Sequence, residues 1–181
     1  MERQSGSEPA DNALLASVRA ILATTAGRWQ RLTETIPEEQ LNQQPAEGEW
    51  SASQCLLHLF ETERYVFPVR VRMFLAGEDI VAFDPDAQAM PTALHPAALA
   101  AEFVELRAAS LALLDTLETP DLARTAHHSE LGVVTLREML NQWAAHDLNH
   151  TIQAERALMQ PFIAGCGPWR SNYEDHDLER R

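Results

Sequence analysis

Four segments of this chain repeat apolar side chains every three or four residues, and each is long enough for roughly six helical turns. They cover residues 12–36, 52–76, 96–118 and 136–159. Amphipathic helices of this length must bury their apolar faces against one another, and no strand pattern of similar strength is present. The sequence therefore predicts an all-α fold, a four-helix bundle over residues 11–160. Residues 1–10 and 161–181 are expected to be flexible or packed tails.

Local signals set the expected helix ends. Residues 51–54 and 135–138 have the form of capping boxes, which begin helices. Asp11 can cap the first helix, Gly77 can end the second, and Pro161 is expected to end the fourth.

Other segments interrupt the helical pattern. Pro68 lies inside the second segment, so we expect a kink or break there. Residues 78–93 predict a long loop between helices 2 and 3, which allows a topology other than simple up-down-up-down. Residues 121–134 lack a helical period and are expected to be extended.

The composition excludes several classes of function. The net charge is -13, which disfavours nucleic acid and anionic membranes as partners. All basic residues are arginine, so lysine Schiff-base chemistry is excluded. No segment has the apolar length of a membrane span or a signal-peptide core. Two cysteines do not suggest a disulfide framework, and we expect a cytoplasmic protein that acts on a small-molecule substrate.

Three histidines are the main candidates for chemistry. His146 and His150 lie four residues apart in one predicted helix, on one face, and His58 lies on the inward face of another. A single inward histidine is more often an ordinary core residue, and such pairs also occur on solvated faces. Three inward histidines in one bundle core, however, favour a shared metal ion, because buried imidazoles are costly unless something satisfies them.

The pair His146 and His150 also resembles parts of two enzyme motifs. His146 to His150 resembles the H-E-x-x-H motif of zinc proteases, with Asp147 in place of the glutamate. Aspartate is one methylene shorter, and no convincing third ligand follows. His146 and Asp147 alone also form only a weak match to HD-type phosphohydrolases.

A wider set of motifs occurs in a characteristic order. It comprises Gly48-Glu49-Trp50-Ser51, His58-Leu59, Glu63-Arg64, His146-Asp147-Leu148-Asn149-His150 and Gln153. In this order the chain resembles the DinB-like (DinB/YfiT-type) superfamily of metal-binding four-helix bundles, from about Leu14 to Met159. The resemblance implies an up-down-down-up topology, and one divalent metal, zinc or nickel, bound by His58, His146 and His150. It also implies a homodimer.

The resemblance leaves the reaction open. Some members are thiol S-transferases that use bacillithiol, mycothiol or glutathione, and many have no established reaction. We expect a thiol-dependent S-transferase; the alternatives are a metal-binding stress-response or interaction protein without turnover, and a metal-dependent hydrolase. A cationic patch beside the metal would favour the transferase. A fourth protein ligand would favour the metal-binding protein without turnover, and a carboxylate near a metal-bound water would favour the hydrolase. The cations considered are Arg64, Arg70, Arg72 and Arg107.

Neighbours of the ligands are also predicted, although no catalytic residue is assigned. Glu63, Asn149 and Gln153 are candidates to fix the imidazole tautomers. Trp143 is expected to line the pocket. Trp50 could do so too, although packing or helix capping is the favoured role for it.

Overall fold

The structure is a computed structural model that describes residues 8–80 and 95–180. Its described α-helices are α1 (Glu8–Thr35), α2 (Glu38–Asn42), α3 (Ala52–Tyr65), α4 (Phe67–Ala76), α5 (Pro96–Leu114) and α6 (Leu136–Gly165). A hairpin of β1 (Thr125–His128) and β2 (Gly132–Thr135) precedes α6, and 3-10 turns lie at Thr119–Ala123, Gly167–Tyr173 and Leu178–Arg180.

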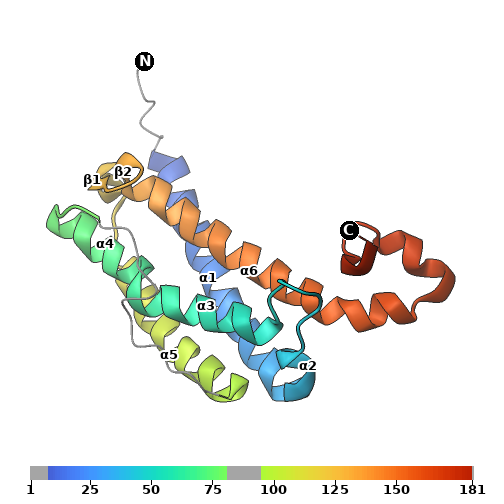
Figure 1. Cartoon of the computed structure of the whole chain (residues 1–181). Coiled ribbons are helices and arrows are strands. Elements are labelled where there is room, and N and C mark those ends of the chain that lie inside the picture. Colours follow the sequence, from blue (N-terminus) through green and yellow to red (C-terminus); the bar gives the residue numbers. More distant parts are fainter. Residues whose placement is uncertain (1–7, 81–94, 181) are drawn as a thin grey trace.

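The long helices form an all-α four-helix bundle with up-down-down-up topology. In Figure 1, α1 and α6 run in one direction, and α3 and α5 both run in the other. Helix α1 packs against α5 and α6, and α3 packs against the same two helices. The consecutive helices α1 and α3 therefore stand at opposite corners. Parallel α3 and α5 require the long connection after α4, as the sequence predicts.

The bundle core has two clusters of buried side chains. One, which includes Leu22, Phe67 and Trp143, fills the end near the hairpin. The other, which includes Trp29 and Phe103, fills the end near α2. Helices α1, α5 and α6 contribute to both clusters, whereas α4 contributes to the first and α3 to the second.

Three predicted helix boundaries are confirmed. The Ser51 hydroxyl accepts from the backbone N–H of Gln54, and the Gln54 side chain accepts from the backbone N–H of Ser51. The second capping box, at the start of α6, is present as well. Gly77 ends α4 in the left-handed conformation, with φ of 74°.

Other boundaries differ from prediction. Helix α1 begins at Glu8, so Asp11 is no cap but lies in the first turn and pairs with Arg137. The expected break falls at Val66, before Pro68, because a proline in the first turn of α4 cannot continue the preceding helix. The third helix ends at Leu114 and a 3-10 turn follows.

The prediction that Pro161 ends the last helix is wrong, because α6 continues to Gly165 with the proline inside it. Contacts around the proline offset its missing hydrogen bond. The Gln160 side chain donates to the carbonyl oxygens of Arg156 and His176 and accepts from the backbone N–H of Leu178. The tail after α6 is thus tied back to the helix.

Residues 121–134 are partly extended, as expected. β1 and β2 pair antiparallel, with His128 opposite Gly132. Ile80 joins the hairpin after α4 through hydrogen bonds with the backbone of His127 and Ser129. Most of the predicted 78–93 loop lies outside the described residues. Within the described part, no helix is both long and apolar enough to cross a membrane.

Candidate metal centre

The structure brings the three predicted histidines together between α3 and α6. His58 comes from α3, and His146 and His150 come from successive turns of α6. One ring nitrogen of each lies within 4.8 Å of the others, and the Nε2 atoms of His58 and His146 are 3.0 Å apart. Two such nitrogens at this distance share either a proton or a metal ion.

The geometry fits a small divalent cation. With metal–nitrogen distances of about 2.0–2.1 Å, two tetrahedral imidazole ligands lie roughly 3.3 Å apart. His150 Nδ1 pairs with Gln153 Oε1 at 2.9 Å, which leaves Nε2 of His150 as the nitrogen available to a metal. The predicted neighbour Gln153 thus contacts one imidazole of the cluster.

The electrostatics fit the same ion. Burial and the neighbouring His150 lower the pKa of His58 to about 4. Burial, His150, His58 and Arg107 together lower the pKa of His146 to about 3. Burial also lowers the pKa of His150. The three imidazoles are therefore neutral at neutral pH, which is the form that binds a metal.

Two aromatic rings enclose the cluster. Trp50 stacks on His150, with centroids 5.7 Å apart, and meets His58 edge-on at 5.2 Å. Phe67 meets His146 edge-on at 5.1 Å. Trp50 is 37% exposed, so the cluster borders solvent on its side. Packing or helix capping was the role favoured for Trp50, so its contact with the histidines was not predicted. Trp50 lies directly before the capping box, where apolar residues fold back over the start of the helix, and this position was the available signal.

The other predicted neighbours lie elsewhere. Trp143 was expected to line the pocket, but it is fully buried and stacks on Phe67 at 5.2 Å, one layer behind the cluster. Glu63 is buried and forms an ion pair with Arg107 rather than bonding to an imidazole. Asn149 is exposed, and within the described residues it has no hydrogen bond to a histidine.

A buried charge network lies behind the ligand helix. Arg107, 1% exposed, contacts both carboxylate oxygens of Asp147, at 2.8 and 3.2 Å, and an oxygen of Glu63 at 2.9 Å. Asp147 follows His146 directly, so it points about 100° away around the helix. It is therefore committed to Arg107 and does not occupy the place of a protease general base.

The four arginines considered for a cationic patch do not assemble beside the cluster. Arg107 is neutralised by its two carboxylates, and Arg64 lies 3.8 Å from Glu102. Arg72 donates to the carbonyl of Pro68, and Arg70 lies beside His128.

A different arginine lies near the histidines. A cavity of about 310 Å³ adjoins the cluster through Trp50 and Gln153, and Asn149 and Arg156 also line it. Arg156 donates from Nε to the carbonyl of His176, and its buried Nη2 has no partner among the described residues. Sequence reasoning missed Arg156 because the tail that packs against it is distant along the chain.

Comparison with known proteins identifies the family. Residues 21–154 match the model of the DinB superfamily. The chain is similar to YfiT from Bacillus subtilis, described as a probable metal-dependent hydrolase with an unusual four-helix bundle topology, at 20% identity and a TM-score of 0.70, over 87% of this chain and 90% of YfiT. It is also similar to the DinB-like protein YjoA from Bacillus subtilis, at 20% identity and a TM-score of 0.57, over 78% of this chain and 90% of YjoA. No curated protein matches significantly. Because the family model spans most of the chain, this protein belongs to the DinB superfamily.

Proposed function

We propose that His58, His146 and His150 bind one divalent metal ion, zinc or nickel, and that the protein is a metal-dependent thiol S-transferase. Three histidines leave a tetrahedral ion one open position, and the described residues supply no fourth ligand. When bound, such an ion supplies Lewis acidity that keeps a thiol deprotonated at neutral pH.

The observation that carries this proposal is that the three-histidine cluster has an open position while the buried carboxylates of Glu63 and Asp147 form ion pairs with Arg107. A hydrolase needs a carboxylate or similar base near the attacking water. Glu63 on α3 and Asp147 on α6 are buried and both are paired with Arg107, whereas Glu61, three residues after His58, is buried without an ion pair among the described residues. A thiol activated by the ion needs no such base.

The adjoining cavity suits a charged thiol. Low-molecular-weight thiols such as glutathione carry carboxylates, and Arg156 offers a cation there. In the reaction, the thiolate sulfur forms a bond to an electrophilic carbon, and the leaving group departs with its bonding electrons. Trp50 and Phe67 pack against the imidazole rings beside the open position.

A metal-dependent hydrolase is the second candidate. It is favoured by the similarity to YfiT, which is described as a probable enzyme of that kind. We also expect a cytoplasmic homodimer; Leu148 and Ile152, exposed one turn apart on α6, support an interface there.

The test is metal content followed by activity. Untagged protein is compared by elemental analysis with His146→Ala/His150→Ala, and with His127→Ala as a control that removes an exposed histidine from β1. We expect about one zinc or nickel per chain, lost only in the double variant. The loaded protein is then assayed with bacillithiol, mycothiol or glutathione and 1-chloro-2,4-dinitrobenzene, alongside an ester. Absence of metal would reject the site, ester hydrolysis alone would favour the hydrolase, and metal without either activity would favour a binding protein.

A further inference from the structure

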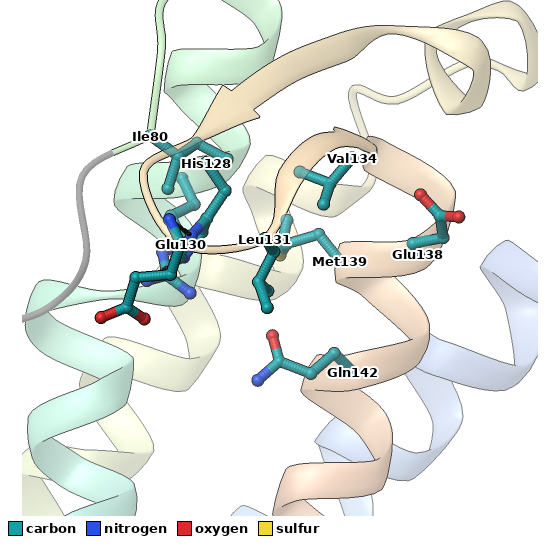
Figure 2. A pocket seen from close by; sticks show the side chains of 9 residues that line it. Ile80, His128, Glu130, Leu131, Val134, Glu138, Met139 and Gln142 are labelled. Atoms are coloured by element: carbon teal, nitrogen blue, oxygen red, sulfur yellow. Dashed lines mark hydrogen bonds between the residues drawn. The ribbon is translucent and has the colours of Figure 1, made fainter.

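A second cavity, of about 420 Å³, lies at the hairpin end of the bundle. It lies between α4, the β1–β2 hairpin and the first turns of α6. Its lining residues are Arg70, Ile80, His128, Glu130, Leu131, Val134, Glu138, Met139 and Gln142. Figure 2 shows Leu131, Val134 and Met139 around one space, with the carboxylates of Glu130 and Glu138 at opposite ends. The size is that of a small-molecule site.

His128 places a hydrogen-bond donor in this cavity. The side chain is only 6% exposed. Its Nδ1 accepts from the backbone N–H of Glu130 at 3.2 Å, and a neutral imidazole has only one accepting nitrogen. Nε2 therefore carries the hydrogen.

Arg70 places a second donor at the same point. Its Nη2 lies 3.5 Å from His128 Nε2. Both are N–H donors, so this contact is not a hydrogen bond between them but a pair of donors facing a shared space. Neither nitrogen has an acceptor among the described residues. Burial lowers the pKa of Arg70 and the carboxylate of Glu130 opposes this shift, but no ion pair joins the two among the described residues.

We propose that this cavity binds a small monocarboxylate with an apolar body. One carboxylate can accept from Arg70 and His128 together, and a buried donor left unpaired is costly. Ile80, Val134 and Met139 offer apolar contact to the rest of the molecule. The negative charges of Glu130 and Glu138 at the ends disfavour a dianion such as a phosphate monoester.

The site is distinct from the histidine cluster. Gln142, which lines the cavity, precedes His146 by one turn of α6. On α4, Phe67 contacts His146 and lies about one turn before Arg70. The proposal uses none of the three histidines of the cluster, so it holds or fails independently of the proposed function.

The test is calorimetric titration of the full-length protein with 3-phenylpropionate, and with 3-phenylpropanamide as the neutral counterpart. We expect the acid to bind and the amide to bind at least roughly tenfold more weakly. Arg70→Gln should weaken acid binding by a similar factor. Arg72→Gln removes the same charge two residues away, outside the cavity lining, and should leave binding unchanged. Glu130→Gln should strengthen it, because it removes a repelling carboxylate.

Four outcomes overturn the proposal. The first is equal binding of acid and amide, and the second is acid binding that Arg70→Gln leaves intact. The third is acid binding that disappears when the protein is treated with EDTA, since this would place the carboxylate on a metal. Circular dichroism and thermal unfolding of each variant establish that it is folded. A folded wild-type protein that binds no acid refutes the proposal as well.

Discussion

Replacing Arg107 with methionine tests whether the buried charge network holds the ligand helix in place. The guanidinium joins α5 to Glu63 on α3 and to Asp147 on α6. It also donates to the carbonyl of Leu22 on α1. One side chain therefore links all four corners of the bundle. Methionine has a similar length and no charge, so Arg107→Met leaves two carboxylates buried without a cation.

The expected loss follows from that burial. Breaking a buried ion pair by removing one partner costs about 3–5 kcal/mol. In a chain of this size each kcal/mol lowers the midpoint of thermal unfolding by about 2–4 °C, so we expect a decrease of roughly 6–20 °C. Burial already raises the pKa of Glu63, and Arg107 opposes this rise. A raised pKa in the folded state favours folding at low pH, so the deficit of Arg107→Met should shrink as the pH falls from 7.5 to 5.5.

Urea unfolding followed by circular dichroism measures the difference at each pH. Arg64→Met is the matched control, since that arginine is exposed and its pair with Glu102 should contribute less than about 1 kcal/mol. The variant Arg107→Met/Asp147→Leu/Glu63→Leu should recover much of the stability, because it buries no charge. A deficit for Arg107→Met no larger than that of Arg64→Met would refute the reasoning.

Three further predictions concern separate features. In metal-free protein the lowered pKa values of His58 and His146 mean that the unfolded chain binds more protons, so urea stability should fall as the pH decreases from about 6.5 toward 4; a flat profile contradicts this. Burial raises the pKa of Cys55 to about 12, so Ellman's reagent should label one thiol per folded chain and two in urea, and rapid labelling of both would be inconsistent with the structure. Gly77→Ala should cost about 1 kcal/mol in urea unfolding, because φ is 74°, whereas Gly165→Ala, in a helix with free space, should not destabilise; equal effects would rule out a conformational cause.

The bundle and the histidine cluster could be predicted because their signals are local. The spacing of His146 and His150 fixes their common face, and the capping boxes fix where α3 and α6 begin. Once the helices pack, the inward face of α3 brings His58 to the pair. Each step needs only helical geometry and burial.

The partners of buried charges could not be predicted in the same way. Arg107 was one of four arginines considered for a cationic patch beside the metal, but its charge is neutralised by carboxylates 40 and more positions away in sequence. Which carboxylate meets which arginine depends on the packing of three helices. Pro161 shows a similar limit, because contacts with the distant tail allow α6 to pass through it.

The diagonal placement of α1 and α3 has a consequence for synthesis of the chain. When only the first half has left the ribosome, α1 and α3 both lack the long helices they pack against, since α5 and α6 are still to come. Helix formation without packing is marginal. The stable fold must therefore wait until the last long helix is made, and α6 also brings two of the three histidines. Assembly of the bundle and completion of the cluster are thus the same late event.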